Sequence, residues 1–507
     1  MNAKPGGIQS RGTLAPMPTL TVALIAIPAL LIVSVILSKG ASRFGIPALS
    51  VFLFIGIIAG KEGPGGFAFT NYAVAQTLGI LALIFILHAG GLGTTLEDVR
   101  AIRGSALVLS TVGVVVASAL VGAFAVRMLR FDWLHGLLLG ATIASTDVAA
   151  VFTILRSRSV SLQGRIRPLL ELESALNDPM TVFLSVGLLQ MLTRPGGASF
   201  WSLVPMFVRQ MTLGTLAGVA AGRGIQWALN RAMLEFEGLY PVLSVALVVL
   251  TYGLTERVGG SGFLAAYVSG IVLGNAPYVH KRSLTMFHDG LAWLMQIIMF
   301  LTMGLLVLPS EVLRVAVPGV AVSAFLVFVA RPVSVVVCLT PFRYPLREQL
   351  MISWAGLRGA VPIVLATYPL IAGVPEAKTI FNLVFFVVFI SVLLQGATIP
   401  AVSRWLNVAA PLGKRFRYPI EYTPTGDEKN QLVEVPVPAG SAAVGRRLVD
   451  LGLPAGALVV LIRRDDDVFV PRGNTAIEAG DVLLVLAERD ALNFARAIVN
   501  AGGTDSA

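Results

Sequence analysis

The chain has 507 residues, of which 56% are hydrophobic and 13% are charged. An ordinary soluble domain carries about 25% charged residues. One soluble core cannot bury so much apolar surface, so the composition predicts an integral membrane protein. The single Cys338 excludes a disulfide framework and a cysteine-rich metal site, and four histidines argue against a histidine-based metal centre. The formal net charge of +10 then raises the question of where the basic residues lie.

Apolar segments of spanning length recur along the first 405 residues. A helix needs about 20 apolar residues to cross the membrane, and the first segment, residues 18–38, is uncharged. It is too long for the apolar region of a signal peptide, so we interpret it as a retained helix. Twelve more segments follow, at residues 44–60, 73–95, 104–126, 132–155, 168–192, 203–222, 238–255, 259–277, 288–308, 313–340, 349–371 and 379–402. The sequence therefore predicts an all-α polytopic membrane protein with about 13 transmembrane helices.

The loops between these segments differ in charge. With 13 spans, one set of alternate loops carries 18 Lys and Arg residues and the other set carries 7. Short cytoplasmic loops hold the excess of positive charge, so the first set is predicted to be cytoplasmic. The N-terminus is then extracytoplasmic, the C-terminal tail is cytoplasmic, and we expect a multi-pass protein of the inner (plasma) membrane.

The composition changes near the end of the chain. Residues 419–507 hold 13 acidic and 8 basic residues and no spanning segment. Strand-like runs at residues 432–436, 457–462, 468–470 and 482–487 alternate with turn signals, and helical patterns lie at 443–451 and 489–499. We predict a transmembrane domain over residues 1–405, a linker over 406–429 and a small cytoplasmic α+β domain over 430–500.

The fifth predicted span contains the run Ser145-Thr146-Asp147 near its middle. A charge at mid-bilayer costs about 2.5–3.5 kcal/mol on insertion scales, so such residues usually line a path or pair with each other. One interpretation is a broken helix whose free carbonyls and carboxylate coordinate a cation. The alternative is a helix-end Asp147 that faces a water-filled vestibule.

The sixth predicted span carries three polar residues on one helix face. Glu171, Ser174 and Asp178 are spaced i, i+3 and i+7. A carboxylate buried here favours its neutral form, so proton binding competes with binding of a metal ion. For Glu171 alone we favour a simpler role as a helix cap near the inner loop.

A second stripe and a proline accompany this face. Glu173 and Asn177 are spaced i, i+4 beside it, and Pro179 follows Asp178 directly. A proline removes the hydrogen bond to residue i−4, so it frees the carbonyl of Ala175.

The twelfth predicted span holds Arg358 between Gly356 and Gly359, with Pro362 four residues later. A buried arginine requires an anionic partner, and Glu173 is the predicted one. An arginine that reaches the interface is a weaker alternative, because membrane segment flanks it on both sides. Two interrupted helices, one in each half of the chain, are typical of transporters built from inverted repeats.

His88 in the third span is a candidate proton relay, although a packed or water-facing histidine is the simpler interpretation. No Walker A, GxGxxG or HExxH pattern is present. We therefore predict neither ATP-driven pumping nor an NAD site, and expect a protein that is not an enzyme and has no cofactor.

These motifs resemble those of the monovalent cation:proton antiporters, in particular the NhaP type that includes potassium/proton antiporters. The similarity in hydropathy covers about residues 18–405. The C-terminal domain resembles the TrkA-C (RCK-C) domain of potassium-transport regulators. The matching motifs are Thr146-Asp147, Glu173-Ser174-Ala-Leu-Asn177-Asp178, Gly356-Leu-Arg358-Gly-Ala-Val361, Gly445-Arg-Arg-Leu-Val-Asp-Leu and Val470-Pro471-Arg-Gly473.

The resemblance implies a role for each matching residue. Asp178 would bind the cation and the proton alternately, Ser174 and Asp147 would supply oxygens, and Thr146 would contribute its main-chain carbonyl. Asn177 and Glu173 would be structural, with Glu173 holding Arg358. One departure is Ala89 beside His88, where relatives often carry an acidic residue, so a ligand role at that point of the third span is in doubt.

The resemblance also implies exchange of cytoplasmic potassium, or sodium, for external protons. Asn177 stands where related antiporters carry a second aspartate, which favours electroneutral exchange. A sodium/proton antiporter is the nearest alternative. An RCK-regulated cation channel is another, but no TVGYG-type filter is present. We further expect a homodimer and no nucleic-acid partner.

The tail domain offers a candidate site for a small anionic or nucleotide ligand, at Arg463, Arg464 and Arg472. Solvated surface arginines are the alternative interpretation, and the one we favour.

Overall fold

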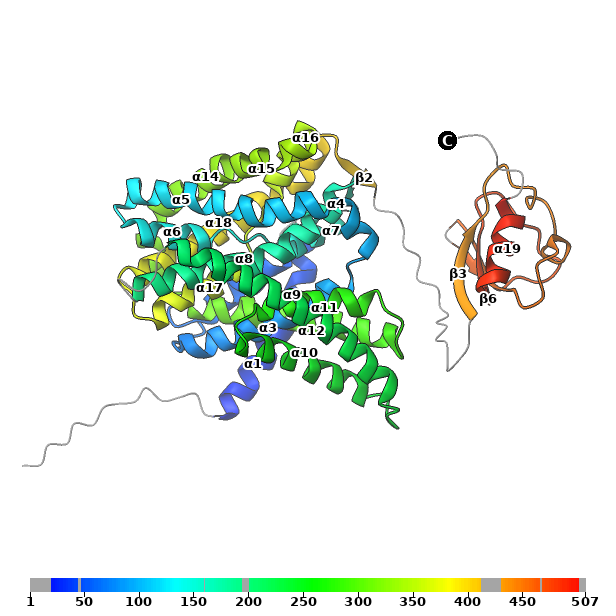
Figure 1. Cartoon of the computed structure of the whole chain (residues 1–507), viewed down its shortest axis with the longest axis horizontal. Helices are drawn as coiled ribbons and strands as arrows, with labels where there is room; N and C mark the ends of the chain where they lie inside the picture. Colours follow the sequence, from blue (N-terminus) through cyan, green and yellow to red (C-terminus); the bar gives the residue numbers. More distant parts are fainter. Residues whose placement is uncertain are drawn as a thin grey trace, which may run out of the picture. The chain divides into compact units, whose positions relative to one another are not determined.

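The computed structural model describes residues 20–43, 47–158, 160–193, 200–411, 430–465 and 467–500. The chain forms two compact units, which divide between Leu412 and Gly413 (Figure 1). This division falls inside the predicted linker, most of which lies outside the described residues. The predicted domain boundaries themselves stay predictions.

The first unit is almost entirely helical, as Figure 1 shows. In chain order its α-helices are α1 (Leu20–Arg43), α2 (Ala48–Ala59), α3 (Tyr72–Leu92), α4 (Leu96–Val108), α5 (Val114–Leu129), α6 (Trp133–Thr142), α7 (Val148–Ser157), α8 (Ile166–Thr193), α9 (Phe200–Arg231), α10 (Leu239–Arg257), α11 (Gly262–Gly274), α12 (Lys281–Leu306), α13 (Pro309–Arg314), α14 (Ala316–Phe325), α15 (Arg331–Leu339), α16 (Leu346–Trp354), α17 (Val361–Ile371) and α18 (Ala377–Trp405). The π-helical turns Leu109–Gly113 and Leu326–Ala330 join α4 to α5 and α14 to α15.

Eight helices in the described part of the chain are long and apolar enough to cross a membrane. Four shorter apolar helices accompany them, at Leu24–Gly40, Ala48–Ala59, Gly262–Gly274 and Val361–Ile371. Each predicted span coincides with one helix, one continuous helical run or one interrupted pair. The largely helical membrane fold is therefore confirmed, whereas the count of 13 spans stays a prediction.

Two of the predicted spans are interrupted helices. The first breaks between α6 and α7, where the Asp147 carboxylate accepts a hydrogen bond from the Ala150 amide at 3.1 Å and so caps α7. The second breaks between α16 and α17, and Pro362 occupies the first turn of α17, where its missing N–H is not needed. The two breaks are joined directly, because the Asp147 amide donates to the Leu357 carbonyl at 2.6 Å.

Glycines allow several helix pairs to pack at very short range. A Cβ atom on Gly270 of α11 would lie 2.3 Å from the main-chain oxygen of His88 in α3, and one on Gly304 of α12 would lie 2.3 Å from that of Leu53 in α2. Between apolar helices in lipid, such close packing replaces the hydrophobic driving force available in water. These contacts pack α11 closely against α3 and α12 closely against α2.

The second unit is a small antiparallel sheet with one α-helix. Its strands are β3 (Asn430–Pro436), β4 (Leu458–Arg464), β5 (Asp467–Phe469) and β6 (Val482–Glu488), in the order β3-β6-β4-β5, and α19 (Arg489–Asn500) follows β6. The side chains of Ile462, Ile477 and Leu483 are fully buried in its core. The predicted α+β fold and all four strands are confirmed.

The predicted helix at residues 443–451 is wrong. Gly445 has a φ of +81° and only Leu448–Leu451 form a short 3-10 turn. The left-handed backbone at this glycine interrupts the helical hydrogen bonds that the apolar spacing favoured.

We predict that Gly270→Ala lowers the free energy of unfolding by about 1–3 kcal/mol, because the new methyl group overpacks the α3–α11 contact. Thermal unfolding of the purified protein in detergent measures the effect. The control is Gly253→Ala in α10, where a Cβ meets nothing within 4 Å; alanine there favours the helix by about 1 kcal/mol. Equal melting temperatures for the two variants would contradict the packing argument.

Candidate ion-binding site

The candidate site lies where the two interrupted helices meet. Gly359, in the second break, packs directly on the Asp147 side chain, and a Cβ atom at this position would lie 2.3 Å from Asp147 Oδ2. Only glycine leaves room for the carboxylate here. The two breaks therefore fit together through one main-chain hydrogen bond and one glycine contact.

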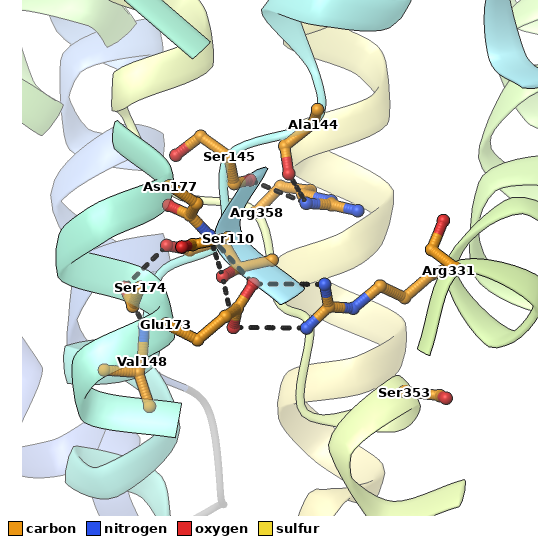
Figure 2. A network of polar contacts seen from close by, with 12 residues as sticks. Ser110, Ala144, Ser145, Val148, Glu173, Ser174, Asn177, Arg331, Ser353 and Arg358 are labelled. Atoms are coloured by element: carbon orange, nitrogen blue, oxygen red, sulfur yellow. Dashed lines mark hydrogen bonds and ion pairs between the residues drawn. The ribbon is translucent and has the colours of Figure 1, made fainter. Parts of the chain in front are cut away.

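Arg358 neutralises the carbonyl end of the first break. Its Nη1 donates to the carbonyl oxygens of Ala144 and Ser145, at 2.5 and 2.8 Å, and the residue is 1% exposed. These carbonyls follow the C-terminal end of α6, which carries the negative end of the helix dipole. The predicted pairing of Arg358 with Glu173 is therefore wrong, because the hydrogen bonds of this guanidinium go to main-chain oxygens (Figure 2).

Glu173 is held by Arg331 instead. Arg331 Nη1 donates to Glu173 Oε1 at 3.1 Å, and Arg331 Nη2 donates to Glu173 Oε2 at 3.2 Å. Dashed lines mark this bidentate pair in Figure 2. The exposed fractions of the two side chains are 4% and 1%. A fork of this geometry satisfies both carboxylate oxygens of a group that is fully out of water.

Arg331 is a site residue that the polar runs of the sequence do not predict, although the sequence carries a signal for it. It is an arginine inside the apolar run Ala316–Phe342, next to Pro332 and directly after a π-helical turn. Gly356 makes space for it, since a Cβ atom there would lie 2.7 Å from Arg331 Nε. An arginine at spanning depth predicts a buried acidic partner.

Asn177 and Thr146 complete the support around Glu173. Asn177 Nδ2 donates to Thr146 Oγ1 at 2.6 Å and to Glu173 Oε1 at 3.0 Å, while Thr146 Oγ1 donates to Glu173 Oε2 at 3.2 Å. The helix α8 is thus tied to the first break by side-chain hydrogen bonds at two adjacent turns.

Asp178 and Ser174 face the same break from α8. The Ser145 hydroxyl donates to Asp178 Oδ1 at 2.5 Å, and Asp178 is 8% exposed. The Ser174 hydroxyl donates to the Thr146 carbonyl at 2.8 Å and accepts from the Val148 amide at 3.3 Å. The residues predicted to supply oxygen ligands to the cation therefore lie together, in one network of direct contacts.

Two other predicted residues lie apart from this network. His88 Nδ1 lies 3.2 Å from both the Ala266 carbonyl and Ser269 Oγ of α11, and its ring centroid is 5.0 Å from that of His288 in α12. A relay role for His88 stays a prediction. Glu171 does not cap α8: it is the sixth residue of the helix and pairs with Arg167 at 3.0 Å.

In the C-terminal unit, Arg464 is already engaged. Its guanidinium donates to both Asp481 carboxylate oxygens at 2.9 Å and also contacts Glu478 and the Ala476 carbonyl. The arginine therefore serves the fold of this unit. An anionic ligand would have to displace two carboxylates to reach it.

Comparison with family models places this arrangement among known proteins. A model described as "Sodium/hydrogen exchanger, transmembrane" matches residues 29–405, and a TrkA-C domain model matches residues 432–500. The chain belongs to the sodium/hydrogen exchanger family. The match includes both interrupted helices and every residue of the candidate site.

Curated relatives match nearly the whole chain. The K(+)/H(+) antiporter NhaP of Alkalimonas amylolytica is 38% identical over 474 residues, which cover 93% of this chain and 82% of the relative. The K(+)/H(+) antiporter NhaP2 of Shewanella oneidensis is 39% identical over 469 residues, covering 91% and 80%. The Na(+)/H(+) antiporter NhaP of Pseudomonas aeruginosa is 29% identical over 354 residues, covering 65% and 81%.

A solved structure has the same fold. The sodium proton antiporter MjNhaP1 of Methanocaldococcus jannaschii superposes with a TM-score of 0.66 at 21% identity, covering 78% of this chain and 100% of that one. At this identity the likeness establishes the fold of the membrane unit.

We predict that Arg331→Ala destabilises the protein by about 3–5 kcal/mol, because it leaves the Glu173 carboxylate buried without a counterion. Thermal unfolding in detergent measures the loss. Adding Glu173→Gln to this variant removes the unpaired charge. The double variant is therefore expected to recover part of the lost stability.

The control is Glu348→Gln. Glu348 pairs with Arg165 at 3.5 Å, with side chains 25% and 43% exposed, and pairs this exposed contribute about 0–1 kcal/mol. Similar losses for the Glu348 and Arg331 variants would show that burial of the Glu173 pair is not what matters.

Proposed function

We propose that this protein is a secondary active antiporter that exchanges cytoplasmic potassium for external protons at Asp178. Asp147, Ser174 and Thr146 supply further oxygens to the cation. Asn177, Glu173, Arg331 and Arg358 hold the site in shape. Such hard monovalent cations prefer oxygen ligands, and this donor set consists of carboxylates, hydroxyls and a carbonyl.

One observation carries the proposal: Asp178 is buried opposite a serine hydroxyl, with no arginine bonded to it among the described residues. An ionised carboxylate in an apolar bundle requires a counterion. Glu173 has Arg331, whereas Asp178 is left to bind either a proton or a cation. These two states exclude each other, and that exclusion is the chemical basis of exchange.

The charges of the site support one-for-one exchange. Three carboxylates, Asp147, Glu173 and Asp178, lie in the network with two guanidinium groups, Arg331 and Arg358. If all five are ionised, one bound proton or one bound monovalent cation makes the site neutral. Movement of the site across the membrane in either state then carries no net charge, so exchange is electroneutral.

Potassium is favoured over sodium by the relatives. The K(+)/H(+) antiporters NhaP of Alkalimonas amylolytica and NhaP2 of Shewanella oneidensis match 91–93% of the chain at 38–39% identity, whereas the Na(+)/H(+) antiporter NhaP of Pseudomonas aeruginosa matches 65% at 29%. The oxygen donors themselves suit both ions. Sodium/proton exchange is therefore the second candidate, and an RCK-regulated channel has less support.

The remaining features belong to the same proposal. Residues 1–405 carry out transport and residues 430–500 form a regulatory TrkA-C domain, joined by a linker over 406–429. The N-terminus is extracytoplasmic, the C-terminal domain is cytoplasmic, and the protein is a non-enzymatic homodimer in the inner membrane. The excess of basic residues in one set of loops supports this orientation.

We predict that Asp178→Asn abolishes exchange and leaves the protein folded, because asparagine keeps the size of the side chain but cannot alternate between a proton and a cation. Dequenching of a pH-sensitive dye in everted vesicles, after addition of potassium or sodium, measures exchange. Asp132→Asn is the control, since the Asp132 side chain is 94% exposed. Substantial exchange by a folded Asp178→Asn variant would move the central role to another residue.

We also predict that the exchange rate in proteoliposomes is independent of membrane potential, since each loaded state of the site is neutral. The measurement compares initial rates at zero potential and at imposed potentials of either sign. A rate that changes steadily with potential would refute one-for-one exchange without refuting antiport itself.

A further inference from the structure

Glu171 lies in α8 between the N-terminal end of this helix, which follows a predicted inner loop, and the candidate site. It shares one face of α8 with Ser174 and Asp178, at i, i+3 and i+7, and two helical turns correspond to about 10 Å along the axis. Its side chain is 34% exposed, whereas Ser174 and Asp178 are each 8% exposed. Exposure therefore decreases from Glu171 towards the candidate site.

The segment of chain that precedes Glu171 is rich in arginine. The connection between α7 and α8 and the helix ends beside it carry Arg156, Arg158, Arg165 and Arg167. These charges repel a cation that approaches from this side. Glu171 is the carboxylate of α8 that follows this basic segment, one turn before Ser174.

The pair that Glu171 forms with Arg167 can open at low cost. Exposed i, i+4 ion pairs contribute only about 0.3–0.5 kcal/mol. Here the arginine precedes the carboxylate, which is the less favourable order, and Arg167 is the second residue of α8, where the helix dipole disfavours a positive charge. The Arg167–Glu171 pair therefore contributes little to the stability of α8.

We propose that Glu171 is an affinity-determining residue for transport, the carboxylate that captures an entering hydrated monovalent cation before it reaches Asp178. Arg167 acts as its resting counterion and is displaced by the cation. Glu171 then sets the apparent affinity for the cytoplasmic cation, while the exchange step itself stays with Asp178. This inference rests on the proposed antiport and on its orientation.

The test uses the full-length protein in everted vesicles, whose outer face is the cytoplasmic one, with potassium as the probe. Glu171→Gln is expected to raise the KM for potassium about three- to tenfold, the effect of one charge about 10 Å away in a medium of intermediate dielectric constant. The maximal rate is expected to stay within about twofold of wild type. The difference in KM should shrink when choline chloride raises the ionic strength, because salt screens the exposed carboxylate.

Three further variants separate a charge effect from a structural one. Glu171→Asp keeps the charge and should keep the wild-type KM. Arg167→Gln removes the competing cation and should lower the KM, even if Glu171→Gln does not fold. Glu237→Gln removes an exposed carboxylate from the connection between α9 and α10 and should leave the KM unchanged.

An unchanged KM in Glu171→Gln, or a loss of maximal rate at unchanged KM, overturns the inference while the wild type still exchanges ions. If Glu171→Gln does not fold, an unchanged KM in Arg167→Gln overturns it. A wild type that exchanges neither potassium nor sodium overturns the proposed function, and this inference with it.

Discussion

Compensation of charge inside an apolar bundle is the constraint on which the site depends. Each ionised group there has a specific neutraliser: Arg331 for Glu173, main-chain carbonyls for Arg358, and the first turn of α7 for Asp147. Without these partners each charge would be strongly disfavoured in the low-dielectric interior. Asp178 is the exception, because among the described residues it is bonded to a serine hydroxyl and to no arginine; this is why we propose it as the residue that binds the cation or the proton.

The same partners make the site rigid. Arg358 joins the second break to the first, Arg331 joins α15 to α8, and Asn177 joins α8 to the first break. Gly356 and Gly359 are needed because the Arg331 and Asp147 side chains occupy the space of their missing Cβ atoms. The two breaks, α8 and α15 are therefore linked by direct contacts, and the proposed antiport by alternating access would require them to move together.

Much of this could be predicted from the sequence, because the relevant signals are local. Hydropathy located the helices, and polar runs inside them located both breaks. Helical spacing placed Ser174 and Asp178 on one face. The partners of the arginines could not be predicted in this way, since they depend on how distant helices cross. The sequence predicts that Arg358 pairs with Glu173. In the structure the crossing of the two breaks brings Arg358 to the Ala144 and Ser145 carbonyls, and Glu173 pairs with Arg331.

The identity of Asn177 shows how the charge of the site is limited. Its amide group donates to both Thr146 and Glu173, at 2.6 and 3.0 Å, and the part of the chain that the structure describes offers no hydrogen-bond partner to its buried Oδ1. An ionised aspartate accepts hydrogen bonds but donates none, so at this position it would lose both bonds and place a second negative charge beside Glu173. It would also add a fourth carboxylate to a site with two guanidinium groups. The asparagine therefore serves the support network and the charge balance together, and in the proposed mechanism Asp178 is the carboxylate that exchanges a proton for a cation.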